Sequence, residues 1–253
     1  MRFELLYNPG LLCERLGYKA QQRRRLKKLR HTPARNLAVG HIESLELLEC
    51  TRVVGIKVIY DVGANVGTWS LLARSVIPEA SIEAFEPIPK HHISFNRILR
   101  GVEGVNLHPL ALGSQNTSAV LRVTDFSDAS SFLPLAEASR TQFGVKEVEQ
   151  LETQMRRLDD YRLEQKMAFP DLIKLDVQGY ELEILKGASE CLRAAKAVVV
   201  EVSFIEYYRG QCLFHDVVEF LAQFGLLLTA LGVHTRLGTE MHQTDALFLR
   251  RQV

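Results

Sequence analysis

The chain has 253 residues, 47% of them hydrophobic and 24% charged, with a formal net charge of +1, as expected for a globular protein with one α/β core. No apolar run approaches the roughly 20 residues that span a bilayer, and no secretory signal is evident, so we expect neither a membrane span nor export. The four cysteines are Cys13, Cys50, Cys191 and Cys212, and they contain no C-x-x-C pair. This spacing predicts reduced thiols in a cytoplasmic protein and no zinc site.

The small net charge conceals a strongly basic N-terminal segment. Residues 1–35 contain ten lysines and arginines against two acids, whereas the rest of the chain contains 21 basic and 28 acidic residues. Six of the eight residues from Arg23 to Arg30 are basic. This tract either forms a solvated helical extension that packs Leu26 and Leu29 against the body, or it attracts an anionic membrane surface. No aromatic residue interrupts the run, which argues against nucleic acid as its partner.

Apolar periodicity predicts the remaining elements. A short helix within residues 37–54 places Ile42, Leu45 and Leu48 on one face, so residues 1–54 are expected to form a basic extension with short helices. The adjacent His91 and His92 point in different directions and are expected at the surface. The predicted α/β elements are strand 57–62, helix 68–76, strand 81–86, helix 89–100, strand 104–110, strand 172–176, helix 180–192, strand 197–203, helix 214–223 and strands 226–230 and 246–249.

Residues 58–67, Val-Ile-Tyr-Asp-Val-Gly-Ala-Asn-Val-Gly, lead from a β-branched strand through a small-residue loop into a helix. Glycines at 63 and 67 allow backbone amides to approach a ligand, and the helix that follows presents unpaired amides to an anion. The dinucleotide fingerprint fails, because Asn65 and Thr68 occupy its second and third glycine positions, and the ending of a P-loop is absent. The loop therefore predicts another nucleotide-like cofactor at the carboxyl end of a parallel strand.

An acidic residue follows at the distance that a nucleoside site requires. The second strand ends at Glu86, 19 residues beyond Gly67, where a carboxylate can accept hydrogen bonds from both ribose hydroxyls. The order of strand, helix, strand and acid predicts a nucleoside cofactor.

Residues 114–160 interrupt the regular alternation. Residues 119–123 alternate as a strand does, whereas residues 135–155 fit either a helix or a mobile loop. A long irregular segment inside a compact domain is usually a functional lid or a disordered excursion, and both interpretations stay open here.

Two motifs in the second half are characteristic. Residues 171–181 read Asp-Leu-Ile-Lys-Leu-Asp-Val-Gln-Gly-Tyr-Glu, residues 184–188 read Ile-Leu-Lys-Gly-Ala, and an apolar strand then leads to Glu201. With the loop at 61–67, which resembles motif I of class I S-adenosylmethionine-dependent methyltransferases, this series resembles the signature of FkbM-type methyltransferases over about residues 55–250. Gln178 stands where glutamate is commoner in that family. The amide keeps the hydrogen-bonding shape but not the charge, so substrate preference could differ.

The resemblance implies a Rossmann-like class I methyltransferase fold of the α/β class. Residues 55–253 would form the methyltransferase domain, with an insertion at about 114–160 near the substrate. The sheet would be mostly parallel and seven-stranded, with helices on both faces and an antiparallel last strand. The implied cofactor is S-adenosyl-L-methionine, and the residues expected to bind it are Asp61, Gly63, Asn65, Gly67, Glu86 and Ala111.

Methyl transfer from a sulfonium requires alignment and a dry pocket, and a hydroxyl acceptor also benefits from a base. Asp176 ends a strand at the ligand-binding edge and is expected to act as this base or to orient the acceptor; its alternative role is a helix cap. Glu201 ends the next strand and is the second catalytic candidate, or it pairs with Lys174. No metal ligand set is assigned, although Asp176, Glu181 and Glu201 together could bind a divalent cation.

The implied function is O-methylation of a hydroxyl on a sugar, glycolipid or natural product. The expected partners are a small-molecule, glycan or lipid-linked acceptor and an anionic membrane surface at the basic tract. The basic tract favours a nucleic-acid or N-methyltransferase as an alternative, but the chain has no Pro-Pro pair and so lacks the Asp/Asn-Pro-Pro-aromatic motif of amino-directed enzymes. A non-catalytic scaffold in glycan assembly and an NAD-dependent oxidoreductase are further alternatives.

Overall fold

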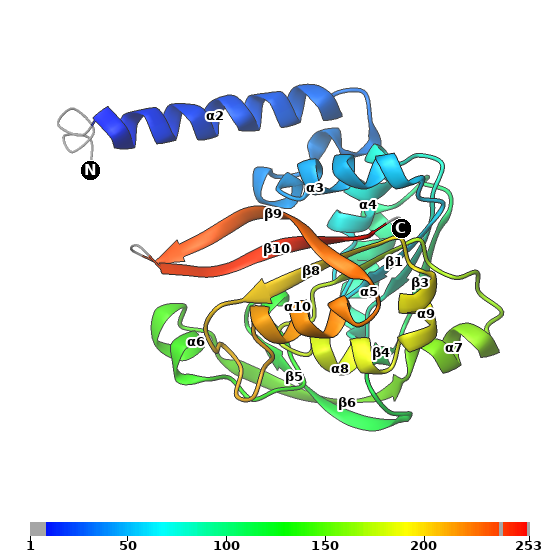
Figure 1. Ribbon diagram of the computed structural model, residues 1–253. Coiled ribbons are helices and arrows are strands. Elements are labelled where there is room, and N and C mark those ends of the chain that lie inside the picture. The colour runs from blue at the N-terminus through cyan, green and yellow to red at the C-terminus, as the bar shows by residue number, and fades with distance from the viewer. Residues whose placement is uncertain (1–8, 238–239, 252–253) are drawn as a thin grey trace.

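The computed structural model describes residues 9–237 and 240–251. A seven-stranded sheet in the order β3-β2-β1-β7-β8-β10-β9 forms the centre, and Figure 1 shows helices on both of its faces. The first five strands in this order are parallel, whereas β10 is antiparallel to both of its neighbours, which confirms the predicted sheet. The strands are β1 (Val58–Val62), β2 (Ser81–Phe85), β3 (Val105–His108), β7 (Leu172–Leu175), β8 (Ala197–Ser203), β9 (Leu226–Leu237) and β10 (Glu240–Arg250).

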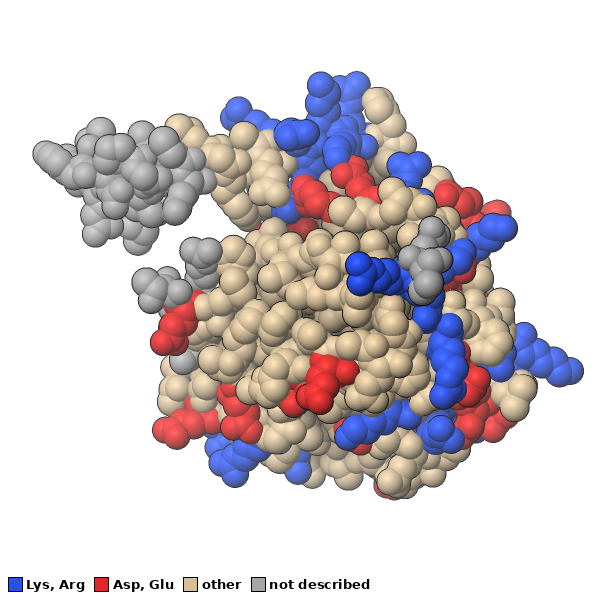
Figure 2. Space-filling view, viewed as in Figure 1, with Lys and Arg blue, Asp and Glu red and all other residues tan. Residues whose placement is uncertain are grey.

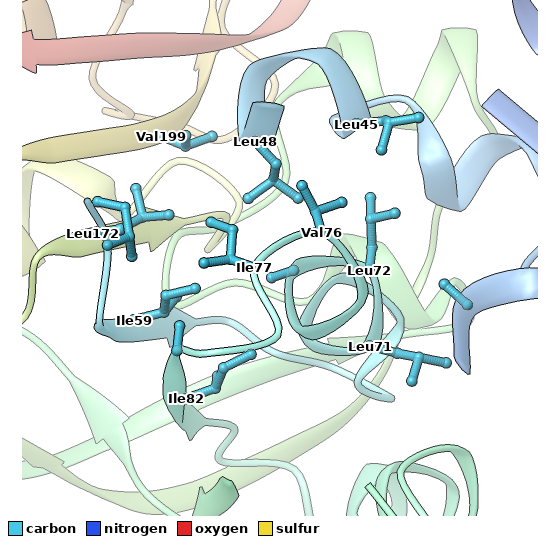
Figure 3. Packing of buried hydrophobic residues seen from close by; sticks show 14 of the residues in the cluster. Leu45, Leu48, Ile59, Leu71, Leu72, Val76, Ile77, Ile82, Leu172 and Val199 are labelled. Atoms are coloured by element: carbon cyan, nitrogen blue, oxygen red, sulfur yellow. The ribbon is translucent and has the colours of Figure 1, made fainter. Parts of the chain in front are cut away.

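Alternate residues of the central strands enter two separate cores, because successive side chains of a strand point to opposite faces. On one face Ile59, Leu172 and Val199 pack against helices α3 (Leu45–Thr51) and α4 (Thr68–Val76), as Figure 3 shows. Helix α5 (Pro89–Ile98) packs beside α4. The opposite face is covered by α8 (Glu181–Lys186), α9 (Ser189–Ala194) and α10 (Phe214–Ala222).

The predicted helix 180–192 is divided into α8 and α9 at Gly187. A Cβ at this glycine would lie 2.1 Å from the carbonyl oxygen of Gly113, so the two backbones touch where the helix breaks. Such a contact between distant parts of the chain leaves no trace in the local periodicity.

Residues 111–156 contribute a second sheet of three strands, in the order β4-β6-β5. The helix or mobile loop predicted for residues 135–155 is wrong from residue 147 onward: α6 (Glu137–Gln142) is a short helix, but β6 (Glu147–Arg156) pairs antiparallel with β5 (Thr117–Thr124). The two-residue β4 (Ala111–Leu112) pairs with the end of β6. Helix α7 (Leu158–Glu164) then leads back to the central sheet.

The N-terminal segment forms part of the main core. The predicted short helix is α3, and it is preceded by the 3-10 turns η1 (Pro33–Asn36) and η2 (Val39–Ile42) and followed by η3 (Arg52–Val54). Ile42, Leu45 and Leu48 are fully buried in the same cluster as Ile59. The predicted boundary at residue 55 therefore falls inside one continuous core.

Helix α2 (Pro9–Leu29) carries the basic tract and lies along one side of the body (Figure 1). Leu29 packs into the core as predicted, but Leu26 is 40% exposed. Within the described residues, no helix combines the length and apolar character needed to cross a bilayer.

Candidate active site

A cavity of about 430 Å³ lies at the carboxyl ends of β1, β2, β7 and β8. Strand order reverses between β1 and β7, and ligands of open α/β sheets bind at such a reversal. The volume lies in the range of small-molecule sites. Most of the predicted site residues line the cavity: Gly63, Asn65, Glu86, Ala111, Asp176 and Glu201.

The glycine turn after β1 forms one wall of the cavity. Gly63 has φ of +79°, and a Cβ there would lie 2.0 Å from the carbonyl oxygen of Asp176 at the end of β7. The amides of Gly63 and Ala64 both donate to the carbonyl of Phe85 at 3.0 Å. The contact with β7 therefore requires glycine at position 63, and the glycine's own amide is already bonded; the approach of a ligand to the other amides of this turn stays a prediction.

Gly67 plays a similar part behind the turn. It begins α4 with φ of +86°, and a Cβ would lie 2.8 Å from a ring carbon of Phe95 on α5. Gly67 does not line the cavity, whereas the next residue, Thr68, does. The close packing of the two helices explains this glycine.

Glu86 lines the cavity with its carboxylate held in place. One oxygen accepts the amide of Asn65 at 2.9 Å, and the other accepts the amide of Ile88 at 2.8 Å. His91 Nδ1 lies 3.2 Å from Glu86, and His92 Nε2 lies 2.8 Å from the Glu86 carbonyl oxygen. His91 is buried, so its predicted position at the surface is wrong. Nothing in the local sequence pattern indicated that Glu86 would contact His91.

Asp61 and Lys174 form a buried ion pair beneath the glycine turn. They are paired in register on β1 and β7, so their side chains point to the same face, and the charged atoms lie 3.5 Å apart. Asp61 also accepts a hydrogen bond from Ser70 at 2.5 Å. It does not line the cavity, so the structure places it behind the predicted cofactor site. Burial raises the pKa of Asp61, although Lys174 opposes this effect.

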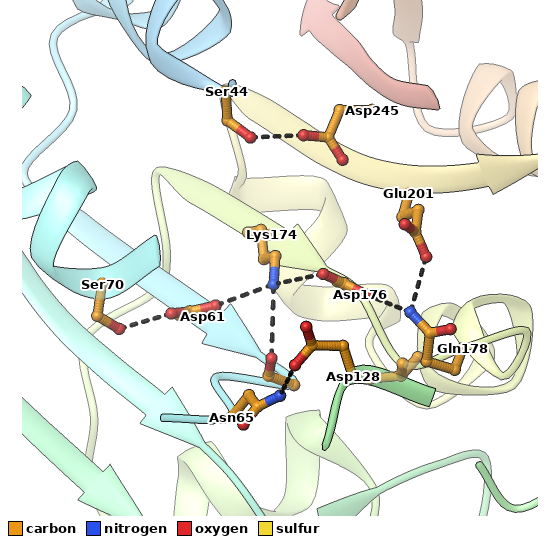
Figure 4. Close-up of polar contacts among 12 residues, drawn as sticks. Ser44, Asp61, Asn65, Ser70, Asp128, Lys174, Asp176, Gln178, Glu201 and Asp245 are labelled. Carbon is orange, nitrogen blue, oxygen red and sulfur yellow. Dashed lines mark hydrogen bonds and ion pairs between the residues drawn. The ribbon is translucent and has the colours of Figure 1, made fainter. Parts of the chain in front are cut away.

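Lys174 connects this pair to the cavity, which it lines. Its ammonium nitrogen lies 3.3 Å from the carboxylate of Asp176 and 3.5 Å from the Gly63 carbonyl oxygen (Figure 4). Burial alone would lower its pKa, but the surrounding carboxylates, Asp176 first, raise it. From the sequence, Lys174 was expected only as a partner for Glu201. A lysine inside an apolar strand is the signal for its larger role, because a buried charge needs partners.

Gln178 joins the two candidate catalytic acids. Its side-chain nitrogen donates to Asp176 at 2.8 Å and to Glu201 at 2.9 Å (Figure 4). Its side-chain oxygen accepts from the hydroxyl of Tyr208 at 3.0 Å. Gln178 adopts φ of +59°, which turns it back over the end of β7. Burial and the neighbouring Asp176 raise the pKa of Glu201 well above that of an ordinary carboxyl group.

Two alternatives for these acids do not hold. Asp176 caps no helix: α8 begins at Glu181, whose own carboxylate accepts the amides of Val177 and Gly179 at 3.1 Å. Among the described residues, Lys174 forms its ion pairs with Asp61 and Asp176 and none with Glu201.

The acids are not arranged as a metal site. Across residues 9–237 and 240–251, no group of three His, Cys, Asp or Glu side chains could hold a metal ion. Glu181 is buried against the backbone of its own turn and does not line the cavity, so it lies apart from the other two acids of the suggested cation site.

Part of the cavity lining is apolar. Ile88 and the predicted Ala111 lie there with Phe132 and Tyr180, whose ring centres are 5.1 Å apart. Asp128 also lines the cavity and accepts a hydrogen bond from the Asn65 side chain at 2.6 Å. The two aromatic residues were not predicted as lining, because Phe132 lies in the irregular segment. Three further lining residues were not predicted either: Gly40, His41 and Gln243.

The strand order with its antiparallel β10 is that of the Rossmann-like class I methyltransferase fold. Residues 61–228 match the profile of the FkbM methyltransferase domain. The chain therefore belongs to the FkbM family of methyltransferases.

Characterised relatives are similar over much of the chain. The 2-O-methyltransferase NoeI of Sinorhizobium fredii is 27% identical over 67% of this chain and 73% of the relative. The 31-O-demethyl-FK506 methyltransferase FkbM of Streptomyces tacrolimicus is 28% identical over 75% of this chain and 80% of the relative. Methyltransferase 1 of Beauveria bassiana is 28% identical over 52% of this chain, and the match spans 58% of that relative's length.

Proposed function

We propose that this methyltransferase transfers a methyl group from S-adenosylmethionine to a hydroxyl of a sugar, a glycolipid or a natural product. The observation that carries the proposal is the pairing of Asp176 and Glu201 through Gln178 on one wall of the cavity that Glu86 also lines. The names of the relatives agree with it: NoeI is a 2-O-methyltransferase, and another relative, AglP of Haloferax volcanii, is a hexuronic acid methyltransferase 27% identical over 57% of this chain.

The residues present fit the cofactor. Glu86 is only 4% exposed; one carboxylate oxygen accepts the Ile88 amide and faces His91 Nδ1, and the other accepts the Asn65 amide, so this second oxygen keeps a lone pair that suits a ribose hydroxyl. Ala111 and Phe132 give an apolar surface for a purine ring, and the turn at Gly63 and Asn65 closes the space between them. Asp61 and Gly67 support this turn from behind. When bound, S-adenosylmethionine would supply a methyl group already activated by the sulfonium charge.

The acid pair provides proton transfer for a hydroxyl acceptor. An alcohol is a weak nucleophile at neutral pH, and a base with a pKa near the working pH accelerates its reaction. Burial and the neighbouring Asp176 raise the pKa of Glu201 and thereby favour its uptake of a proton, so we assign proton removal to Glu201. Asp176, fixed by Lys174 and Gln178, orients the hydroxyl.

Calorimetric titration of the purified chain with S-adenosylmethionine and, separately, with NAD tests the cofactor. We expect binding of the first compound alone. The protein is then incubated with methyl-labelled S-adenosylmethionine and a panel of sugars, glycolipids and polyketides, and the product is located by mass spectrometry.

Two variants test the acids. Asp176→Asn and Glu201→Gln should bind the cofactor as the parent does but transfer methyl at least about 100-fold more slowly. Absence of cofactor binding in the parent, or a label found on nitrogen or nucleic acid, would contradict the proposal.

A further inference from the structure

Helix α2 has two different faces. In a helix of 3.6 residues per turn, residues 22, 25 and 29 lie on one side, and residues 19, 23, 27 and 30 lie on the other. The first set is buried against the body and the second is exposed. The exposed set consists entirely of cations: Lys19, Arg23, Lys27 and Arg30.

Only some of the cations of α2 form ion pairs with acids of the body. Arg25, 1% exposed, lies 2.7 Å from Glu46 on α3, and Lys28 lies 2.5 Å from Glu49 one turn later. The hydroxyl of Tyr18 donates to Glu43 at 3.3 Å. Glu43, Glu46 and Glu49, the acids beneath α2, therefore contact the side of the helix that faces the body.

The outward cations have no such partners. Within the described residues, none of five exposed side chains forms an ion pair with an acid: Lys19, Arg23, Arg24, Lys27 and Arg30. Like charges four residues apart on a helix repel one another, so the exposed cations of α2 destabilise one another in the isolated chain. Figure 2 shows the resulting gathering of lysines and arginines over α2. An anionic partner would relieve this repulsion.

Apolar side chains accompany these cations. Leu16 is 57% exposed and lies in line with the outward residues, and Leu26 is 40% exposed at their border. A helix that presents cations together with exposed leucines suits the interface of an anionic bilayer, where the leucines enter the acyl boundary and the cations meet phosphates.

Nucleic acid fits this face less well, because single strands are held in a groove with stacking aromatic rings. The one aromatic residue of α2, Tyr18, is tied by its hydroxyl to Glu43 on the body side.

We propose that the outward face of α2 is a docking surface for an anionic lipid membrane, with the helix lying along the bilayer. The attachment is electrostatic and peripheral. It is separate from the cavity and does not depend on the reaction proposed above.

Vesicle co-sedimentation of the full chain tests the proposal. The vesicles contain phosphatidylcholine alone or phosphatidylcholine mixed with phosphatidylglycerol. We expect binding to the mixed vesicles alone and its loss in high salt, because salt screens exposed charges. The triple variant Lys19→Gln, Arg23→Gln and Lys27→Gln should lower the partition coefficient at least about tenfold.

A matched triple variant removes the same charge from other exposed cations and should bind as the parent does: Arg97→Gln, Arg100→Gln and Lys146→Gln. Circular dichroism verifies that both variants fold. Leu26→Gln keeps every charge and should weaken binding by a smaller factor, which gives a second measurement if the α2 triple variant is unstable.

Several results would overturn the proposal. These are failure of the parent to bind the mixed vesicles, equal binding to neutral vesicles, and unchanged binding of both the α2 triple variant and Leu26→Gln. Binding of a single-stranded RNA oligonucleotide that depends on the same cations, without vesicle binding, would identify nucleic acid as the partner instead.

Discussion

Gly63 touches Asp176 so closely that a methyl group on the glycine would lie 2.0 Å from the carbonyl oxygen of the aspartate. The turn after the first strand therefore rests directly on the end of β7, where a candidate catalytic acid is placed. Lys174 contacts both the Gly63 carbonyl oxygen and the Asp176 carboxylate, so it also joins the glycine turn to the end of β7.

The first prediction follows from this contact. Gly63→Ala should lower the free energy of unfolding by about 3 kcal/mol, because the methyl group adds a backbone clash to the strain of positive φ. Gly101→Ala is the matched control: its φ is +75°, but no atom lies within 4 Å of the added carbon, so it should cost about 1 kcal/mol. Urea unfolding measures both. Equal losses of stability in the two variants would show that the close contact with Asp176 adds nothing to the cost of Gly63→Ala.

The same contact shows where reasoning from the sequence succeeds. The glycine turn was found because a β-branched strand, two glycines and a helix follow one another within a few residues. The physical reason for Gly63 was not found, because Asp176 lies far away along the chain. The acids near the ends of parallel strands were predictable, since these ends meet at one edge of the sheet, although Glu86 follows β2 directly and Glu201 lies two residues before the end of β8.

Elements stabilised by distant partners were predicted less well. The central strands and α4 have clear local periodicity and were placed within one or two residues. Strand β6 was not recognised, because its pairing with β5 joins segments separated by a helix. Gln178 was singled out only as a departure from the family, and its bridge between two carboxylates depends on a left-handed turn that no pattern indicated.

The second prediction concerns Glu86. Glu86→Gln removes the negative charge from the proposed ribose contact and should weaken S-adenosylmethionine binding at least about tenfold, because hydrogen bonds to charged groups are the stronger ones. Glu83→Gln is the control: Glu83 lies on β2, three residues before Glu86, but it binds His108 at 2.7 Å outside the cavity. Calorimetry with the cofactor compares the two. If Glu83→Gln weakens binding as much as Glu86→Gln, the ribose assignment fails.

The third prediction concerns the amide between the two acids. Gln178→Glu places a third carboxyl group beside Asp176 and Glu201, and repulsion raises the pKa of Glu201 further. The rising limb of the pH–rate profile should therefore move to higher pH by about one unit.

Tyr208→Phe provides the control for this substitution. It removes the hydroxyl that donates to Gln178 without adding charge, so its profile should keep the midpoint of the parent. The measurement is methyl transfer to an identified acceptor across a pH series. An unmoved limb in Gln178→Glu would exclude Glu201 as the base.

The fourth prediction is a dependence of stability on pH that comes from Glu181. Burial raises the pKa of this carboxyl group to about 6, although the amides of Val177 and Gly179 donate to it and oppose the shift. The folded state therefore holds a proton that the unfolded state releases near the ordinary pKa of 4.5. This contribution to stability is complete below pH 4.5 and is lost as the pH rises through 6.

Glu181→Gln isolates this effect, because its side chain does not titrate. Relative to this variant, the parent should lose about 2 kcal/mol of unfolding free energy between the two pKa values. Urea unfolding at pH values on both sides of the window gives the difference. The prediction fails if the stability of the parent relative to Glu181→Gln stays constant or rises with pH. That result would show that the turn at the start of α8 stabilises the ionised carboxylate of Glu181.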